Sequence, residues 1–427
     1  MSGSPGGYSW WRTMARARPT FVVVGANLSG GAAVSALRQE GFDGRLVLVG
    51  EEPDPPYERP PLSKEYLRGE ADFAQALLRP PEWYRENEVD LRLGVRAERV
   101  DPARRVVELA GGEAVPYDKV LVATGGRNRR LRVPGVDLEG VLDLRTRADA
   151  DRIREAAARA SKAVVVGAGF IGCEVAASLR HLGLDVEVVE VFEAPLQRAL
   201  GPEVGRVLEA VHRDHGVVFH LGQAVVRFEG RSRVERVVTD RDTVLEGDLV
   251  VVGVGIVPNT EVVAEAGVAL DNGVVVDELC RTNVEGVFAA GDVAKHYHPL
   301  FGRHVRVEHW DNALKQGAAA ARSMLGRGAP YDDPHWFWSD QYDVNLQCLG
   351  VATEWDQLVV RGSLEERRFL GFYLKDGVVE AVVGINRGRD VRRCMGLVRA
   401  RRPVDPALLS DEDVDLRELG SRLGGEA

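Results

Sequence analysis

Residues 162–172 read KAVVVGAGFIG, in which an apolar strand runs into the pattern G-x-G-x-x-G and then into a helix. The first glycine, Gly167, makes the tight turn. Gly169 lets the backbone approach a pyrophosphate, and Gly172 lets the helix pack closely on the strand. The helix N-terminus adds backbone N–H groups and the positive end of the helix dipole. This stretch therefore predicts a βαβ unit that binds a dinucleotide.

The returning strand of this unit, DVEVVEV from Asp185, carries Glu190 near its end. A carboxylate at that place accepts hydrogen bonds from a ribose 2′-OH and repels a 2′-phosphate, so Glu190 favours NADH over NADPH. A third Val-rich run, LVVVGVGIVPN from Leu249, ends in another glycine turn. The residues predicted to contact NADH are Gly167, Gly169, Ile171, Gly172, Glu190 and Gly255.

A second unit of the same plan lies nearer the N-terminus, as FVVVGANLSGG from Phe21, a helix, and the strand GRLVLVGEE from Gly44. Asn27 takes the place of the second glycine. Asparagine tolerates positive φ, but its side chain narrows the path of the pyrophosphate. Glu51, at the end of the returning strand, supplies a ribose acceptor. This unit predicts an FAD site that includes Gly25, Asn27, Ser29, Gly30 and Glu51.

Two such units indicate an internal duplication and two parallel sheets. The strand YDKVLVATGGR ends in a glycine turn before the second unit, and FAAGDVA from Phe288 makes sense only if the chain returns to the first domain. From about Tyr331, aromatic alternation and later strands predict an antiparallel sheet with helices. The predicted protein is α/β, with a flexible tail at 1–18, an FAD-binding domain at 19–125 and 254–330, an NADH-binding domain at 126–253 and a C-terminal α+β domain at 331–427.

Composition narrows the class of protein. A chain of 427 residues exceeds what one hydrophobic core usually supports. The formal net charge of -10 argues against nucleic acid as the main partner. The sequence has no apolar run long enough for a membrane helix, and its first residues lack the apolar middle of a secretory signal. We therefore expect a cytoplasmic protein that binds no membrane, with Met14 as an alternative start.

The cysteines and histidines predict no metal. Cys173, Cys280, Cys348 and Cys394 are widely separated, which disfavours a zinc ribbon, an iron–sulfur cluster and a dithiol centre, so we expect buried structural thiols. The histidines at positions 296, 298, 304 and 309 have no cysteine or acid at zinc-ligand spacing.

Six ordered motifs within about residues 20–400 resemble the FAD-dependent, NADH-using ferredoxin reductases that serve bacterial Rieske dioxygenases and cytochrome monooxygenases. The motifs are PYERPPLSK from Pro56, the ATGGR turn, GAGFIGCEVA, FAAGDVA, RVEHWDNALKQG from Arg306 and FWSDQY from Phe337. The resemblance implies a glutathione-reductase-like fold, both FAD and NADH, and electron transfer to a [2Fe-2S] ferredoxin that feeds an oxygenase.

The resemblance also implies two catalytic residues. Lys64 matches a lysine beside the flavin N5 edge, where a cation would stabilise the anionic reduced ring. The alternative for Lys64 is an exposed lysine after two prolines. Glu174 matches a glutamate near the nicotinamide and near that lysine, and it joins the residues assigned to NADH. The alternative for Glu174 is an ordinary acid in the first turn of a helix.

Further FAD contacts follow from the same resemblance. Asp292 matches the aspartate that hydrogen-bonds the ribityl chain, although its place at a strand end also suits a helix N-cap. Trp310 matches a position whose backbone reaches the pyrimidine edge of the flavin. Arg59, Ala97 and Arg145 match positions along the adenine and ribityl portions. We assign Trp336 and Trp338 to core packing, because aromatic alternation in a strand usually serves that purpose.

Two further features bear on the reaction and the partner. Disulfide reductases on this fold have a cysteine pair where this chain has Pro60, Pro61 and Lys64, so electrons must leave the flavin directly. A basic segment at 387–402 predicts an acidic ferredoxin as the docking partner. Its arginines are Arg387, Arg389, Arg392, Arg393, Arg399, Arg401 and Arg402.

The residues leave alternatives open. The basic segment could be a solvated face or an incidental RNA contact. The fold also serves NADH oxidases, quinone reductases and redox-sensing flavoproteins of the apoptosis-inducing-factor type. The chain is expected to be a monomer or a homodimer.

Overall fold

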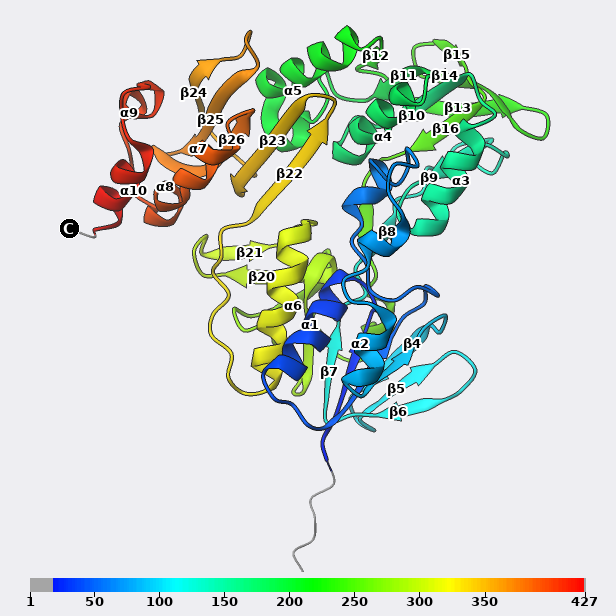
Figure 1. Ribbon diagram of the computed structural model, residues 1–427, viewed down its shortest axis with the longest axis vertical. Helices are drawn as coiled ribbons and strands as arrows, with labels where there is room; N and C mark the ends of the chain where they lie inside the picture. Colours follow the sequence, from blue (N-terminus) through cyan, green and yellow to red (C-terminus); the bar gives the residue numbers. More distant parts are fainter. Residues whose placement is uncertain (1–17, 426–427) are drawn as a thin grey trace, which may run out of the picture.

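The computed structural model describes residues 18–425, which form two parallel sheets with their helices and an antiparallel C-terminal sheet (Figure 1). The predicted fold class is confirmed. The predicted tail, residues 1–18, lies outside the described residues apart from Arg18. Within residues 18–425, no helix is long and apolar enough to cross a lipid bilayer.

The first sheet has the order β19-β7-β1-β2-β3, and all its neighbours are parallel. Its strand β19 comes from far along the chain, where the FAAGDVA motif predicted a return. The domain boundaries themselves remain a prediction. The strands are β1 (Thr20–Val24), β2 (Arg45–Val49), β3 (Val89–Arg92), β7 (Lys119–Val122) and β19 (Val287–Ala289).

Alternate residues of β1 face opposite sides of the first sheet. Phe21 and Val23 pack beneath α1 (Leu28–Gln39) and α6 (Trp310–Met324), which lie side by side in Figure 1. Val22 and Val24 pack beneath an antiparallel sheet of β4 (Ala97–Asp101), β5 (Val106–Leu109) and β6 (Ala114–Pro116). Because both faces are covered, the strand is apolar throughout rather than alternating.

The second sheet has the order β12-β11-β10-β16-β9 and is also parallel. Its strands are β9 (Val141–Asp143), β10 (Lys162–Val166), β11 (Asp185–Glu190), β12 (Val218–Leu221) and β16 (Leu249–Val252). The helices that accompany it are α3 (Arg147–Ala157), α4 (Phe170–His181) and α5 (Gln197–Asp214). A separate antiparallel sheet holds β13 (Val225–Gly230), β14 (Val234–Thr239) and β15 (Val244–Glu246).

Two strands join the first and second sheets. The chain leaves the first sheet through β8 (Gly126–Asn128) and returns through β17 (Ile256–Pro258), and these two strands pair antiparallel. The short elements around the first sheet are α2 (Pro81–Glu86), β18 (Val274–Val276), β20 (Ala294–His298), β21 (Arg303–Val305) and the 3-10 turns η3 (Glu261–Val263) and η4 (Gly291–Val293). The turns η1 (Pro60–Ser63) and η2 (Phe73–Ala76) pack instead against the core of the second and C-terminal sheets.

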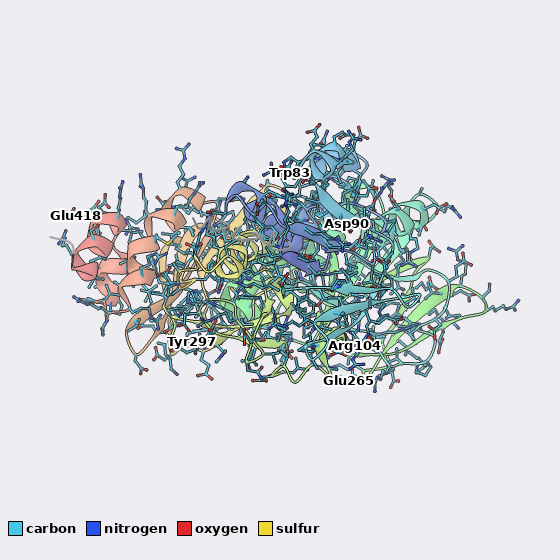
Figure 2. All side chains as sticks on the ribbon, turned by 90° about the horizontal axis from the view of Figure 1, so that it is seen from below. Trp83, Asp90, Arg104, Glu265, Tyr297 and Glu418 are labelled. Carbon is cyan, nitrogen blue, oxygen red and sulfur yellow. The ribbon has the colours of Figure 1, made fainter. Side chains whose placement is uncertain are left out.

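The C-terminal sheet is antiparallel, as the alternation from Tyr331 predicted, with the order β22-β23-β26-β25-β24. Its strands are β22 (Trp336–Gln341), β23 (Val344–Gly350), β24 (Gln357–Ser363), β25 (Arg368–Lys375) and β26 (Val378–Ile385). Four helices follow: α7 (Gly388–Arg393), α8 (Met395–Ala400), α9 (Pro406–Ser410) and α10 (Leu416–Gly424). Figure 2 places α10, with Glu418, at the opposite end of the molecule from the β13–β15 sheet.

Candidate active site

A cavity of about 220 Å³ lies where α1, α4, α6, the η1 turn and β22 meet. The helices α1 and α4 both follow glycine-rich turns, and their first residues line this cavity. The cavity thus joins the two predicted dinucleotide sites in one place. The sequence-predicted residues in its wall are Asn27, Ser29, Arg59, Lys64, Arg145, Ile171, Glu174, Asp292 and Trp310.

The turn before α4 is open toward solvent on its ligand side. A Cβ at Gly169 would meet nothing within 4 Å, and Gly169 caps α4 without a side chain. By contrast, a Cβ at Gly172 would lie 1.9 Å from the Gly167 carbonyl oxygen, which is the close packing that the motif requires. Gly167 has φ +98°, a conformation that glycine adopts without strain. The open space beside free helix N–H groups fits a pyrophosphate.

The turn before α1 differs because Asn27 caps the helix. The Asn27 Oδ1 accepts hydrogen bonds from the backbone N–H groups of Ser29 (3.1 Å) and Gly30 (3.3 Å). Asn27 has φ -109°, so the tolerance of positive φ that we invoked for it is not used. Gly25 carries the positive φ of +119° instead. The asparagine therefore occupies two N–H groups that a glycine would leave to the phosphates.

Two predicted acids lie outside the cavity wall. Glu190 ends β11, and its carboxylate accepts hydrogen bonds from the backbone N–H groups of Ala168 (2.5 Å) and Phe192 (3.1 Å). It thus braces the glycine turn from within the protein. Glu51 is exposed and lies 4.0 Å from Arg96, while its neighbour Glu52 pairs with Arg59 at 2.6 Å.

Seven further predicted residues also lie outside the wall, namely Ala97 and the glycines Gly25, Gly30, Gly167, Gly169, Gly172 and Gly255. A Cβ at Gly30 would lie 1.9 Å from the Gly25 carbonyl oxygen, so this glycine serves close packing of α1. Ala97 opens β4 and packs against the core of the first sheet. Gly255 has φ +94° and faces open space after β16.

Lys64 and Glu174 form a buried ion pair at the cavity. The Lys64 Nζ lies 2.7 Å from the Glu174 Oε2, and it also donates to the Pro60 carbonyl oxygen at 3.1 Å. Only 8% of Lys64 and 4% of Glu174 is exposed. The exposed-lysine alternative is therefore wrong. The alternative for Glu174 is also wrong, because the first turn of α4 contains no acid.

Two hydroxyl groups complete the surroundings of the Glu174 carboxylate. Ser63 donates to its Oε2 at 2.5 Å, and Ser339 donates to its Oε1 at 2.7 Å. With the ammonium of Lys64, three side chains from two other elements hold this carboxylate. A buried charge paired and hydrogen-bonded in this way is held in one position.

At the other end of the cavity, Arg145 contacts residues from several segments of the chain. Its Nη2 lies 2.7 Å from the Asp292 Oδ2, and its Nε donates to the Gly126 carbonyl oxygen at 2.9 Å. Arg59 in turn donates to the carbonyl oxygen of Arg145. Asp292 lies inside η4, whose N-cap is Ala290, so the N-cap alternative for Asp292 is wrong.

The strand β22 supplies cavity residues that the sequence analysis missed. Trp338 lines the cavity and meets Trp310 edge to face at 5.4 Å between ring centroids. Phe337 also lines it and meets Phe170 edge to face at 4.9 Å. Trp336 packs against the C-terminal core as predicted, whereas the core-packing assignment for Trp338 was wrong. The FWSDQY motif was the available signal.

Two titratable side chains in the wall were also missed. Burial raises the pKa of Glu308 and lowers the pKa of His309 to about 4. Three buried polar atoms of the wall, Ser29 Oγ, His309 Nδ1 and Trp310 Nε1, have no hydrogen-bond partner within residues 18–425. Buried polar atoms are normally paired, so these atoms fit a site that a polar ligand completes.

The cysteines are buried, and several histidine rings pack against one another. All four cysteines are free and buried, as predicted. In the part of the chain that the structure describes, no group of three or more His, Cys, Asp or Glu side chains is arranged to hold a metal ion. His298 instead packs its ring against the rings of His296 and His335, at 5.7 and 4.9 Å between centroids.

Comparison with known proteins places these features in a family. Residues 19–317 match the pyridine nucleotide-disulphide oxidoreductase family, and residues 336–420 match the reductase C-terminal family. Rhodocoxin reductase of Rhodococcus erythropolis is 39% identical over 93% of each chain. Putidaredoxin reductase of Pseudomonas putida is 36% identical over 94% of this chain and 97% of the relative.

Solved structures agree with the sequence matches. The crystal structure of the covalent putidaredoxin reductase–putidaredoxin complex has a TM-score of 0.92 and 35% identity, and the match covers 96% of this chain and all of that chain. The predicted resemblance to ferredoxin reductases is therefore confirmed. The chain belongs to the pyridine nucleotide-disulphide oxidoreductase family, among its ferredoxin reductases.

Proposed function

We propose that the protein is an NADH-dependent ferredoxin reductase that contains FAD and passes electrons to a [2Fe-2S] ferredoxin serving an oxygenase. The observation that carries this proposal is the single cavity on which both glycine-turn helices and the buried Lys64–Glu174 pair converge. A two-electron donor and a cofactor that releases single electrons must meet at one place. This cavity offers that place.

The residues of the wall suit the two cofactors. FAD would lie along α1, Arg59, Arg145, Asp292 and Trp310, and NADH would approach over the open turn before α4. Bound FAD supplies a hydride acceptor that can release its electrons one at a time. The chain supplies binding, orientation and charge.

Lys64 has the geometry for an electrostatic role at this site. Its ammonium has three N–H bonds, of which one is donated to Glu174 and one to Pro60. The third remains for a ligand in the cavity that Lys64 lines. We assign Lys64 and Glu174 to the flavin and nicotinamide side of the cavity on this basis.

The cysteines support direct electron transfer from the flavin. No cysteine is among the residues that line the cavity, within the described chain. Burial raises the pKa of Cys173, the cysteine next to Glu174 in the sequence, so this thiol stays protonated and unreactive. This favours a ferredoxin reductase over enzymes of the same fold that use a reactive thiol.

We propose a docking surface for an acidic ferredoxin that is narrower than the sequence indicated. Four of the seven arginines form ion pairs: Arg387 with Asp390 and Glu412, Arg393 with Asp390, Arg399 with Asp332 and Asp333, and Arg401 with Glu380. Arg389, Arg392 and Arg402 are exposed and have no ion pair within residues 18–425. We propose that these three arginines attract the ferredoxin. We also propose that the reductase works in the cytoplasm and is a monomer or a homodimer.

A steady-state assay separates this function from its rivals. NADH-dependent reduction of cytochrome c is measured with and without an acidic [2Fe-2S] ferredoxin. We expect the ferredoxin to raise the rate strongly. A rate that does not change with ferredoxin, together with rapid consumption of oxygen or a quinone, would show an oxidase or a quinone reductase instead.

A further inference from the structure

A chain of buried hydrogen bonds runs from the active-site carboxylate into the C-terminal sheet. Ser339 donates to the Glu174 Oε1 at 2.7 Å, Gln341 Nε2 donates to the Ser339 Oγ at 3.0 Å, and His212 Nε2 lies 2.8 Å from the Gln341 Oε1. Ser339, Gln341 and His212 are each at most 1% exposed. Bulk solvent therefore does not reach these side chains, which hydrogen-bond to one another in sequence.

The chemistry of the groups fixes the direction of this chain. A carboxylate only accepts, so the single hydroxyl proton of Ser339 points to Glu174. The Ser339 oxygen is then free to accept from the amide of Gln341, whose carbonyl oxygen must accept from His212. Burial lowers the pKa of His212 to about 4, so the ring is neutral with its proton on Nε2. Its Nδ1 has no partner within residues 18–425. Every donor in the chain points toward Glu174.

The alternation of β22 explains how this chain is built. Phe337, Ser339 and Gln341 share one face of the strand, which lies against α4, and α4 carries Glu174. Two polar side chains at such buried positions cost free energy unless they are fully paired. An apolar face would pack as well without that cost, so the polar pair marks a requirement other than packing.

We propose that Ser339 and Gln341 are positioning residues for the Lys64–Glu174 pair. Through them, the C-terminal sheet holds the Glu174 carboxylate, which in turn aims the Lys64 ammonium into the cavity. His212 orients the Gln341 amide from the α5 side. This inference rests on the proposed function, because it takes Lys64 to act on the flavin side of the cavity.

Three variants of the full holoenzyme test the proposal. Ser339→Ala removes the donor to Glu174, Gln341→Leu removes the support of that donor, and Ser339→Thr keeps the hydroxyl. The matched control is Gln347→Leu. Gln347 is a largely buried glutamine on the adjacent strand β23, and its hydrogen bonds go to Trp336 and Asn345 rather than to Glu174.

The measurements separate positioning from stability. Stopped-flow mixing with NADH gives the limiting rate of flavin reduction and the Kd for NADH, and thermal unfolding gives Tm. We expect Ser339→Ala to lower the limiting rate about tenfold, the equivalent of one hydrogen bond to a charged group. Gln341→Leu should lower it less, Ser339→Thr should restore it, and the Kd should stay close to that of the wild type.

A second readout does not depend on turnover. In the wild type, ¹⁵N-histidine NMR should show the Nε2-protonated neutral tautomer of His212 with a slowly exchanging proton, and Gln341→Leu should abolish that protection. If Ser339→Ala and Gln341→Leu lose Tm as Gln347→Leu does but keep the wild-type limiting rate, the chain is purely structural and the proposal is wrong. If Lys64→Ala also keeps that rate, the assigned role of Lys64 has failed as well.

Discussion

Lys64 shows how a residue's role can be hidden from the sequence around it. Two prolines precede it, and a lysine in that setting is usually solvated. Its buried ammonium pairs with Glu174, which lies on α4, a helix of the other glycine-turn unit. Only the resemblance to a family indicated the pair, because no local pattern brings together residues so far apart in the chain.

The Lys64–Glu174 pair predicts distinct effects on rate and on stability. Lys64→Met should slow flavin reduction by NADH at least about tenfold, and it should cost about 3 kcal/mol or more of stability because it leaves a buried carboxylate unpaired. The double variant Lys64→Met with Glu174→Gln should regain most of the stability but not the rate. Stopped-flow kinetics and chemical denaturation measure the two effects. A double variant with the wild-type rate would remove the catalytic assignment.

Glu190 makes a second prediction at the level of one side chain. It was predicted from its place at the end of a strand, and the structure adds that it braces the turn through Ala168 and Phe192. Glu190→Gln should reduce the ratio of kcat/KM for NADH to that for NADPH about tenfold, because the repulsion of a 2′-phosphate is lost. It should also lower Tm, because the glutamine amide keeps one acceptor oxygen and its NH2 group cannot accept from the second backbone N–H. A wild type that prefers NADPH would contradict the assignment.

The strand β22 could be predicted only in part from the sequence. Its aromatic alternation predicted an antiparallel strand, and the strand is there. The partners of its two faces were not predicted, because the strand packs against α4 and α6, which come from distant parts of the chain. The alternation of Ser339 and Gln341 at buried positions was a usable signal, since buried polar residues in a strand need partners.

The helices α7 and α8 give a prediction about docking. The sequence showed an excess of arginine but could not show the acids Asp332, Glu380 and Glu412, which neutralise part of it from other segments. The double variant Arg389→Glu with Arg392→Glu should slow ferredoxin reduction strongly at low ionic strength and less at high salt.

Flavin reduction by NADH should not change in that variant, because neither arginine lines the cavity. Arg206→Glu is the matched control for the single variant Arg389→Glu, because both change the net charge by the same amount: Arg206 is exposed on α5 and has no ion pair within the described residues. An equal loss of ferredoxin reduction in Arg206→Glu would show that overall charge, rather than this surface, governs the encounter.

For the whole molecule, the Val-rich strands and glycine turns were sufficient to predict two parallel sheets and their order of appearance. Strands covered on both faces leave a strong apolar signal, and the turns mark where each helix begins. The convergence of three sheets on one cavity was not predictable in the same way. It depends on contacts between segments, such as those from β22 to α4, that no local pattern records.

Buried histidines predict acid sensitivity of the whole fold. Burial lowers the pKa of His212, His296 and His309 from 6.5 to about 4, and that of His335 well below 6.5. Between those values the unfolded chain binds protons that the folded chain does not, so the free energy of unfolding falls as the pH falls below 6.5. The loss is about 1.4 kcal/mol per histidine at pH 5.5.

Denaturant unfolding of the holoenzyme from pH 7.5 to pH 5 measures this effect. His296→Phe should reduce the loss of unfolding free energy at pH 5.5 by the amount that one histidine contributes, about 1.4 kcal/mol. It should leave the free energy of unfolding at pH 7.5 nearly unchanged. A free energy of unfolding that stays constant from pH 7.5 to pH 5 would show that these rings are not held neutral by burial.

The proposed transfer of electrons from NADH through one cavity to a ferredoxin can be followed in a single experiment. Double-mixing stopped flow tests it most directly: the enzyme is first reduced anaerobically with one equivalent of NADH and is then mixed with an oxidised [2Fe-2S] ferredoxin or with oxygen. We expect flavin absorbance to return much faster with the ferredoxin than with oxygen, and the ferredoxin to lose its oxidised absorbance at the same rate. A reduced enzyme that reoxidises rapidly with oxygen and not with the ferredoxin would contradict it.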